Sequence, residues 1–443
     1  MEQIGETNRE IAGVSGPEGR SSLDFSRRIP ELDGLRGLAI AMVLYVHYIW
    51  FGIVAQPPAL LAYFNTMTRP FWSAVDLFFL LSGFLIGGNL LDSRDSPKYF
   101  STFYIRRFCR VLPIYFLFLA LVGIAYRFVY LPVGVPLDWL FAGRLPWYAY
   151  FSFAQNLWMS KWNTPGAVIL TITWAFAVEV QFYMVVPALI RFVRRSALPY
   201  IFIAGFVLAP VARLFIVFRF RANLYATYAL LPCRMDSLFL GLLCAYCLRE
   251  RGAWNWLVKH RSDLWILFFV LLAGIPALNT KGLPLTLLWI TVGYGWMSVF
   301  YATAMILALT NSGSFLSRAL RWPWLTGLGT ISYGVYLFHY GIYGLCMWLL
   351  RGHASLLENW KDFGVTLLAA VITVALGKLS WRYFEKPIVR WSRNWPHSKP
   401  SEAPAARDLT AWAGASGVSK VPDAGQISET RADLSFASTI RRG

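Results

Sequence analysis

One arginine and one histidine have the spacing of partners on a helix. Arg36 and His47 lie eleven positions apart in RIPELDGLRGLAIAMVLYVHY, residues 28–48. At 3.6 residues per turn and 1.5 Å per residue, this separation is about three turns, so both side chains share one helix face roughly 16 Å apart. If the apolar run enters a bilayer at Arg36, His47 lies near mid-membrane. An ionisable side chain at that depth is costly and indicates a functional site.

A second candidate is the pair Arg107 and Arg110 in YIRRFCRVLPIY. Positions i and i+3 share a helix face. Guanidinium groups bind phosphate through paired hydrogen bonds, so this pair could clamp an anion, with Arg36 as a third arm. The alternative is an ordinary basic anchor at the cytoplasmic end of a membrane helix.

Glu179, Ser332 and His339 complete the set of candidate chemical groups. Glu179 lies among aromatic residues in TITWAFAVEVQFYMVVP. A poorly solvated carboxylate either pairs with a cation or carries a proton. Ser332 and His339 in ISYGVYLFHY are seven residues apart and share a helix face, where they could serve chemistry or helix–helix hydrogen bonds. Further charged candidates within or beside apolar runs are Glu31, Asp33, Asp76, Arg234 and Asp236.

The composition is that of a polytopic membrane protein. Of 443 residues, 57% are hydrophobic and only 14% charged, whereas soluble proteins carry about 25% charge. The net charge of +18 fits basic loops that face anionic lipid, and we expect no nucleic-acid partner. Cys244 and Cys247 form a CxxC inside an apolar run, with no second pair at zinc spacing, so we expect no metal site.

The hydropathy pattern predicts an all-α integral membrane protein with a bundle of about ten transmembrane helices, since about 20 apolar residues span a bilayer. An aromatic stretch at 145–158, interrupted by Pro146, Gln155 and Asn156, is expected to be re-entrant or interfacial. The predicted spans are 36–55, 70–92, 111–131, 170–190, 198–218, 226–248, 264–279, 285–309, 325–350 and 363–383.

Loop charges predict that both termini are cytoplasmic. Basic residues concentrate in alternate loops, as the positive-inside rule requires. Residues 1–27 form a polar tail unlike a secretory signal peptide, residues 28–393 form the membrane domain, and residues 394–443 have the composition of a disordered tail. The loops assigned to the inner side include Arg94, Lys98, Arg106, Arg191, Arg194, Arg195, Arg249, Arg251, Lys259, Arg261, Arg318, Arg321, Lys386, Arg390 and Arg393.

Taken in order, these segments resemble the acyltransferase-3 family of integral-membrane acyltransferases. The resemblance covers residues 28 to about 390. Each segment alone is a weak signal, but seven in the same order are specific. They are 28–47, VDLFFLLSGFLI at 75–86, YIRRFCRVLPIYF at 104–116, WAFAVEVQFYMVVP at 174–187, RMDSLFLG at 234–241, ISYGVYLFHY at 331–340 and YFEKP at 383–387.

The family's functional residues map onto the candidates above. Its arginine/histidine pair, with ten residues between them, falls on Arg36 and His47, and its RxxR motif begins at Arg107. The glutamate of its fourth-helix motif falls on Glu179. Two positions depart from the family pattern: Ala175 replaces a usual serine, and Val180 replaces a usual second acid. The extra soluble hydrolase-like domain of some members is not expected here.

The resemblance implies transfer of an acyl group, often acetyl from acetyl-CoA, to a hydroxyl of a cell-envelope carbohydrate or related acceptor in the cell membrane. Under this hypothesis Arg36, Arg107 and Arg110 hold the CoA phosphates and His47 is the general base, since its ordinary pKa of about 6.5 suits proton transfer at neutral pH. Glu179 would orient the imidazole or stabilise its protonated form. Ser332 and His339 would contact the acceptor or the oxyanion.

Alternatives remain at each level of this hypothesis. Transfer could be direct or pass through an acyl-enzyme at His47 or Ser332. A transporter with a buried proton relay would also need charged residues within its spans, although the halves show no internal repeat of the kind common in transporters. A non-catalytic membrane sensor or scaffold would tolerate the departures at Ala175 and Val180.

Overall fold

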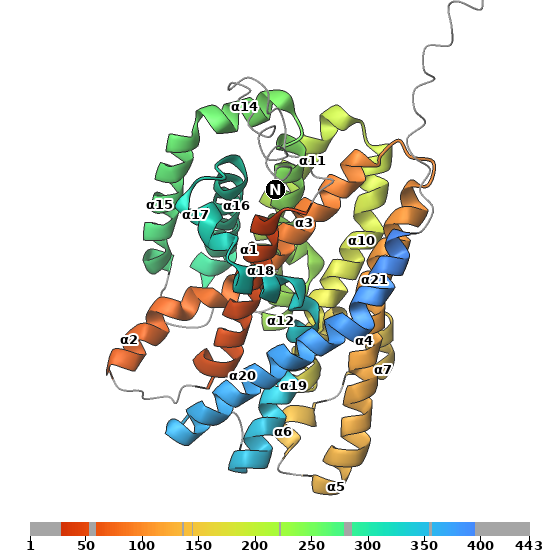
Figure 1. Cartoon of the computed structure of the whole chain (residues 1–443), viewed down its shortest axis with the longest axis vertical. Helices are drawn as coiled ribbons and strands as arrows, with labels where there is room; N and C mark the ends of the chain where they lie inside the picture. Colours follow the sequence, from red (N-terminus) through yellow and green to blue (C-terminus); the bar gives the residue numbers. More distant parts are fainter. Residues whose placement is uncertain are drawn as a thin grey trace, which may run out of the picture. The chain divides into compact units, whose positions relative to one another are not determined.

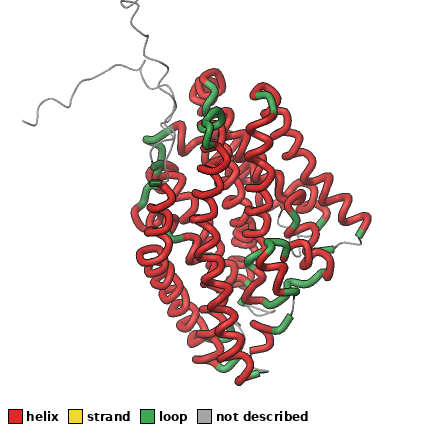
Figure 2. Tube along the Cα trace, turned by 90° about the vertical axis from the view of Figure 1, so that its right-hand side faces the viewer, coloured by secondary structure: helices red, strands yellow, loops and turns green. Residues whose placement is uncertain are grey.

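A computed structural model describes residues 28–52, 59–134, 137–143, 145–220, 223–278, 286–353 and 357–394. Figure 2 shows that helices make up most of these residues, and no strand occurs among them. The predicted all-α class is therefore confirmed. The tail expected at 1–27 and, apart from Asn394, the tail expected at 394–443 lie outside the described residues.

The long helices match the predicted spans in order. They are α1 (Pro30–Tyr45), α3 (Ala74–Asp92), α4 (Tyr99–Ala125), α10 (Trp174–Phe192), α11 (Leu198–Arg219), α13 (Met235–Cys247), α15 (Arg261–Leu278), α16 (Tyr294–Thr310), α19 (Ser332–Arg351) and α20 (Trp360–Ser380). Wider π-helical turns continue α1, α4 and α20 and precede α16, at Val46–Trp50, Tyr126–Tyr130, Trp381–Glu385 and Trp289–Gly293.

Short helices link or extend these spans. They are α2 (Ala59–Thr68), α5 (Leu131–Val133), α6 (Asp138–Phe141), α7 (Trp147–Phe151), α8 (Gln155–Trp162), α9 (Val168–Thr171), α12 (Leu224–Ala229), α14 (Arg251–Lys259), α17 (Phe315–Leu320), α18 (Pro323–Thr330) and α21 (Lys386–Arg393). In Figure 1, α20 continues almost directly into α21, beside α4 and α19.

Within the described residues, eight helices are long and apolar enough to cross a membrane, or nine if α13 and α14 form one span bent by 99°. This finding supports a multi-pass membrane protein. The helix α19 has the necessary length of 20 residues, but its apolar character is lowered by tyrosines, glycines, Ser332 and His339. The expected total of about ten is reached only if α19 also crosses the bilayer.

The stretch 145–158 does not form a span. It is divided between α7 and α8 by a turn in which Phe153 has a φ of 53°, and both helices are too short to cross a bilayer. The polar residues that interrupted the apolar pattern anchor this segment: Gln155 donates to the carbonyl of Thr173 at 2.8 Å, and Asn156 donates to that of Ala229 at 3.1 Å.

Close contacts at glycine hold two helix pairs together. On α3, a Cβ at Gly83 would lie 2.1 Å from the carbonyl oxygen of Leu238 on α13, and one at Gly241 would lie 2.2 Å from that of Leu80. A Cβ at Gly37 of α1 would lie 2.0 Å from the carbonyl oxygen of Leu325 on α18. Small residues permit this approach of backbones, on which packing in membranes depends.

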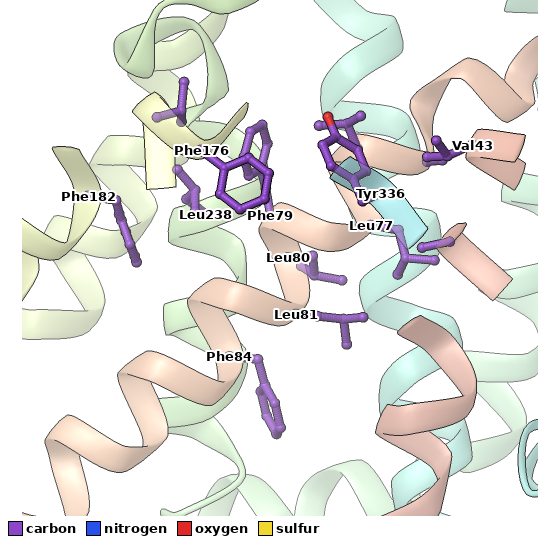
Figure 3. Packing of buried hydrophobic residues seen from close by; sticks show 14 of the residues in the cluster. Val43, Leu77, Phe79, Leu80, Leu81, Phe84, Phe176, Phe182, Leu238 and Tyr336 are labelled. Carbon is purple, nitrogen blue, oxygen red and sulfur yellow. The ribbon is translucent and has the colours of Figure 1, made fainter. Parts of the chain in front are cut away.

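Buried apolar side chains fill the space around α3. Leu77, Leu80, Leu81 and Phe84 are almost fully buried. Figure 3 shows these side chains with residues that belong to four other helices: Val43 of α1, Phe176 and Phe182 of α10, Leu238 of α13 and Tyr336 of α19. This core fixes α1, α10 and α19 around α3. Arg36 lies on α1, Glu179 on α10, and Ser332 and His339 on α19, whereas Arg107 and Arg110 lie on α4.

We predict that Gly83→Ala destabilises the protein, because the added methyl group meets the backbone of α13. Overpacking of this kind costs about 1–3 kcal/mol. The matched control is Gly123→Ala on α4, where a Cβ meets nothing within 4 Å. Thermal unfolding of the purified variants should show a lower midpoint for Gly83→Ala only. Equal midpoints would contradict the close α3–α13 contact.

Candidate active site

Three cavities lie one after another along the helix that carries Arg36 and His47. We name each by its characteristic residues. The arginine cavity, of about 680 Å³, contains Arg36, Arg107 and Arg110. The glutamate cavity, of about 60 Å³, contains Glu179. The histidine cavity, of about 310 Å³, contains His47.

Shared side chains show that the cavities are neighbours. Arg36 lines both the arginine cavity and the glutamate cavity. Val75 and Tyr336 line both the glutamate cavity and the histidine cavity. The glutamate cavity is therefore the narrow middle of a series that begins at arginines and ends at a histidine.

The arginine cavity carries a large excess of positive charge. Asp33 and seven arginines line it: Arg28, Arg36, Arg106, Arg107, Arg110, Arg249 and Arg393. Its volume lies within the range of small-molecule sites, about 300–1,000 Å³. Such a concentration of guanidinium groups favours a polyanionic ligand.

Some of these charges are already paired. Asp33 accepts from Arg28 at 2.5 Å and from Arg36 at 3.3 Å. Arg249 binds Asp92 through two hydrogen bonds of 2.7 Å. In the part of the chain that the structure describes, Arg107 and Arg110 form no salt bridge with a carboxylate. Their charges remain available to a bound anion.

Tyr333 connects the arginine cavity to the glutamate cavity. The guanidinium carbon of Arg110 lies 5.0 Å from the centre of the Tyr333 ring, close enough for a cation–π contact. The hydroxyl of Tyr333 donates to Oε1 of Glu179 at 3.2 Å, and Ser82 donates to the same oxygen at 3.0 Å. Ser332 also lines this cavity.

His47 lies in the π-helical turn that continues α1. Such turns occur frequently at functional sites. Its Nδ1 lies 2.9 Å from the carbonyl oxygen of Val43, which can only accept. Nδ1 therefore carries the proton of the neutral ring, and Nε2 keeps a lone pair. Because His47 lines the histidine cavity, this tautomer is suited to take a proton from a ligand there.

The remaining walls of the histidine cavity are largely aromatic and apolar. The aromatic lining residues are Trp50, Phe51, Phe71, Trp72, Trp174, Tyr225, Tyr228, Tyr336 and Tyr340. Flat aromatic faces with polar edges can pack against a ligand and still supply hydrogen bonds to it.

His339 is fully buried and contacts His47. The two ring centres are 4.8 Å apart. Nδ1 of His339 lies 2.6 Å from the carbonyl oxygen of Tyr336, so it also carries the ring proton. Ser332 and His339 thus belong to different parts of the site: Ser332 lines the glutamate cavity, whereas His339 lies beside His47.

Glu179 is placed differently from its predicted role beside the imidazole. It lies in the glutamate cavity, and its hydrogen bonds go to Ser82 and Tyr333. The residues that contact His47 through their rings are Phe51, His339 and Tyr340. The departures from the family pattern lie nearby, with Ala175 lining the same cavity as Glu179 and Val180 buried.

Glu31 holds the start of α1 in place. This buried carboxylate accepts from the hydroxyl of Ser317 at 2.9 Å and from Nε of Arg321 at 2.7 Å. These bonds join α1 to α17 and the residue that follows it. Glu31 thus serves helix packing and not ligand binding, whereas Asp33 positions Arg36 at the arginine cavity.

Asp76, Arg234 and Asp236 belong to a separate, balanced group of buried charges. Arg234 pairs with Asp76 at 3.0 Å, and Arg213 pairs with Asp236 at 2.8 Å. All four side chains are at most 1% exposed. Two acids and two arginines cancel, as expected for a structural network between helices.

This charged group lies behind the wall of the histidine cavity. The guanidinium carbon of Arg234 is 4.3 Å from the ring centre of Tyr228 and 5.5 Å from that of Trp174, and both aromatic residues line the cavity. The group therefore supports the cavity without lining it.

Several residues of the site were not among the candidates predicted from the sequence. Ser82 carries a single hydroxyl group within an apolar run, and this pattern could have indicated a polar site. Tyr333 and Tyr336 lie within the quoted motif around His339. Arg249 and Arg393 were interpreted only as loop charges, and nothing in their spacing shows that they join the arginine cavity.

No group of three or more His, Cys, Asp or Glu side chains within the described residues could hold a metal ion. Cys244 and Cys247 are free thiols on α13.

We predict that Asp76→Asn strongly destabilises the protein, because it leaves the buried guanidinium of Arg234 without a counter-charge. Breaking a buried pair costs about 3–5 kcal/mol. The control is Glu250→Gln, which removes the exposed pair with Arg195 and should cost at most about 1 kcal/mol. Thermal unfolding distinguishes them. The double variant Asp76→Leu, Arg234→Met should recover part of the lost stability. Equal losses of stability in Asp76→Asn and Glu250→Gln would contradict a structural role for the buried pair.

Comparison with known proteins gives a family and several distant relatives. The Acyl_transf_3 family model, described as an acyltransferase domain, matches residues 29–381. No solved structure matches the chain. The putative peptidoglycan O-acetyltransferase YrhL of Bacillus subtilis is 27% identical over 388 residues, which cover 82% of this chain and 55% of the relative.

Two further relatives differ in length. The peptidoglycan O-acetyltransferase OatA of Listeria monocytogenes is 25% identical over 394 residues, covering 82% of this chain and 56% of the relative. The acyltransferase MdmB of Streptomyces mycarofaciens is 26% identical over 385 residues, covering 82% and 92%. The chain spans little more than half the length of the two peptidoglycan relatives. Since the family model matches most of the sequence, the chain belongs to the acyltransferase-3 family.

Proposed function

We propose that this protein is a membrane-embedded O-acyltransferase that moves an acyl group, normally acetyl, from acyl-CoA to a hydroxyl group of a cell-envelope carbohydrate or related acceptor. The observation that carries this proposal is the series of cavities that runs from an arginine pair to His47. Arg107 and Arg110 lack carboxylate partners in the described chain, and Nε2 of His47 keeps its lone pair. The names of two relatives, a peptidoglycan O-acetyltransferase and a putative one, support the carbohydrate acceptor.

The donor binds with its phosphates in the arginine cavity. Acyl-CoA carries its phosphates at one end and its thioester on a long flexible arm. Arg36, Arg107 and Arg110 hold the phosphates by charge-assisted hydrogen bonds. The arm passes through the glutamate cavity, where Ser82, Tyr333 and Glu179 supply polar contacts, and presents the thioester beside His47.

The acceptor binds in the histidine cavity. Its hydroxyl group gives its proton to Nε2 of His47 as its oxygen attacks the thioester carbonyl carbon. The new carbon–oxygen bond forms, the carbon–sulfur bond breaks, and the CoA thiolate leaves. His47 then returns the proton to the sulfur. This is general acid–base catalysis by one imidazole, and the hydrogen bond to Val43 fixes its tautomer.

Glu179 acts on the donor side in this proposal. Its carboxylate accepts from Tyr333, whose ring lies under Arg110. It therefore positions an arginine and a tyrosine that border the path of the arm. The role first expected for Glu179, to orient the imidazole of His47, is replaced by this one.

The same arrangement supports a topology with both termini in the cytoplasm. Arg28, Arg106, Arg249 and Arg393 come from four segments that loop charges assign to the inner side, and all of them line the arginine cavity. Acyl-CoA then enters from the cytoplasm. Reporter fusions after Arg393 and before Arg28 measure the sidedness, and an external reporter at either position would contradict it.

Labelled acetyl-CoA tests the proposed activity directly. The purified protein is reconstituted in vesicles with [14C]acetyl-CoA and peptidoglycan fragments as the acceptor probe. Label bound covalently to the fragments supports the enzyme. Label that enters vesicles without covalent transfer identifies a transporter, and binding of acetyl-CoA with neither outcome identifies a sensor.

We predict that His47→Gln lowers turnover about 10²–10⁴-fold, since loss of a general base has effects of that size. Binding of CoA should not change, because the phosphates lie in the arginine cavity. The control is His260→Gln. His260 makes the same Nδ1 contact with a carbonyl four residues earlier, at 2.9 Å, but lies outside the three cavities. Label transfer measures the effect, and wild-type turnover in His47→Gln would remove His47 from the mechanism.

We predict that Arg107→Gln weakens the binding of CoA at least tenfold. A charge-assisted hydrogen bond contributes about 1.5–3 kcal/mol, and a factor of ten corresponds to about 1.4 kcal/mol. The control is Arg127→Gln at the far end of the same continuous helix. Calorimetric titration with CoA measures both. An unchanged affinity for CoA in Arg107→Gln would indicate that this arginine is a membrane anchor and not a phosphate ligand.

A further inference from the structure

We infer that Arg106 and Arg393 form a separate phosphate site at the outer end of the arginine cavity, and that this site binds the 3′-phosphate of CoA. The inference rests on the proposed function, in which acyl-CoA occupies this cavity. It adds a donor specificity that the proposed function does not contain. The protein selects CoA thioesters over donors that carry the same pantetheine arm but lack a phosphate on the ribose.

The first observation is where the two arginines lie within the cavity. Arg36 also lines the glutamate cavity, and Arg110 lies over the ring of Tyr333, which lines that cavity too. Arg36 and Arg110 therefore mark the inner end. Arg106 lies one turn before Arg110, about 6 Å along the axis of α4. Its side chain is exposed, as is that of Arg393 at the end of α21. Arg106 and Arg393 therefore mark the outer end.

The second observation is that two helices bring these two charges together. Arg106 belongs to α4 and Arg393 to α21, and α21 packs against α4 (Figure 1). Both side chains line the arginine cavity, and their charges lie close enough to repel each other. Guanidinium groups do not lose their protons in proteins. An anion bound between them removes this repulsion and forms charge-assisted hydrogen bonds to both.

The third observation is the difference between Arg393 and the other arginines that line the cavity from outside α4. Arg28 forms an ion pair with Asp33, and Arg249 forms one with Asp92. Arg393 forms no hydrogen bond and no ion pair with any residue in the described ranges, although its side chain lines the cavity. Its charge is therefore available to a ligand, whereas those of Arg28 and Arg249 are partly balanced.

The chemistry of CoA matches an inner and an outer phosphate site. A pyrophosphate joins the pantetheine arm to adenosine, and a phosphate monoester lies beyond it on the 3′-oxygen of the ribose. If the arm runs into the glutamate cavity, the pyrophosphate lies with Arg36, Arg107 and Arg110, and the ribose lies farther out. A phosphate monoester carries about −1.5 to −2 charges at pH 7. The two guanidinium groups of Arg106 and Arg393 balance this charge.

Two ligands that differ by one phosphate test the outer site. CoA and 3′-dephospho-CoA are titrated calorimetrically into the full chain in nanodiscs of phosphatidylcholine. We expect the wild-type protein to bind CoA at least tenfold more tightly than dephospho-CoA. In Arg393→Gln and in Arg106→Gln, the affinity for CoA should fall to within about threefold of that for dephospho-CoA, and the affinity for dephospho-CoA should not change. Equal wild-type affinities for the two ligands would overturn the inference.

Two further variants show whether the effect is specific to this site. Arg390 lies one turn before Arg393 on α21 but is not among the residues that line the cavity, so Arg390→Gln should keep the wild-type ratio of the two affinities. Arg107→Gln should weaken both ligands by the same factor, because both carry the pyrophosphate. If Arg393→Gln also weakens both ligands equally, Arg393 acts only through its general charge, and the inference is overturned.

A lipid headgroup is a second source of phosphate at this end of the cavity. The wild-type titrations are therefore repeated in nanodiscs that contain phosphatidic acid, whose headgroup is a phosphate monoester. If the 3′-phosphate of CoA is the ligand, the ratio of the affinities for CoA and dephospho-CoA should stay within about threefold of its value in phosphatidylcholine. If phosphatidic acid abolishes the ratio, the lipid occupies the outer site in preference to CoA, and the assignment is overturned.

Rates with two labelled donors separate this inference from the proposed function. With [14C]acetyl-CoA and [14C]acetyl-dephospho-CoA, we expect a KM at least tenfold higher for the dephospho donor and a kcat within about twofold, because the 3′-phosphate is remote from His47. If the protein distinguishes the two ligands in binding but transfers no label, the proposed function fails and the outer site stands. If label is transferred from both donors with the same KM, the outer site fails and the enzyme stands.

Discussion

Two reciprocal hydrogen bonds are the constraint on which the site depends. Tyr48, in the π-helical turn that continues α1, donates to the backbone of α19, and Tyr343 of α19 donates to the backbone of that turn. They join two helices that run in the same direction. Near one end, Arg36 of α1 and Tyr333 of α19 meet at the glutamate cavity, and farther along His47 meets His339. Because both helices are rigid at about 1.5 Å per residue, one contact point sets the register of every candidate group.

The buried charges divide into two kinds with different purposes. Asp76, Arg213, Arg234 and Asp236 form pairs that cancel inside the bundle. The arginine cavity carries seven arginines against Asp33, and its remaining charge faces open space. A protein gains nothing for stability by collecting like charges around a void. The imbalance is therefore the stronger indication of ligand binding, and it distinguishes Arg107 and Arg110 from ordinary membrane anchors more clearly than their spacing does.

Local patterns predicted the elements well and the contacts between them poorly. The helical period placed Arg36 and His47 on one continuous helix, and apolar runs located the long helices in order. Glu179 was expected beside His47 but lies with Ser82 and Tyr333, because the sequence does not show which face of α10 meets α19. For the same reason, the pairing of Asp236 with Arg213 and the arrival of Arg249 at the arginine cavity depend on packing between helices far apart in the chain.

The width of the glutamate cavity has a consequence for the membrane itself. Its volume of about 60 Å³ lies between cavities of about 680 and 310 Å³, and the hydroxyl of Tyr336, at its border with the histidine cavity, is bonded to the carbonyl of Ile172. In the proposed mechanism, the thioester arm would occupy this narrow cavity as it passes. Such an arrangement would deliver an activated group through the bilayer without opening a conducting pathway, so that the ion gradients of the cell would be preserved during each cycle.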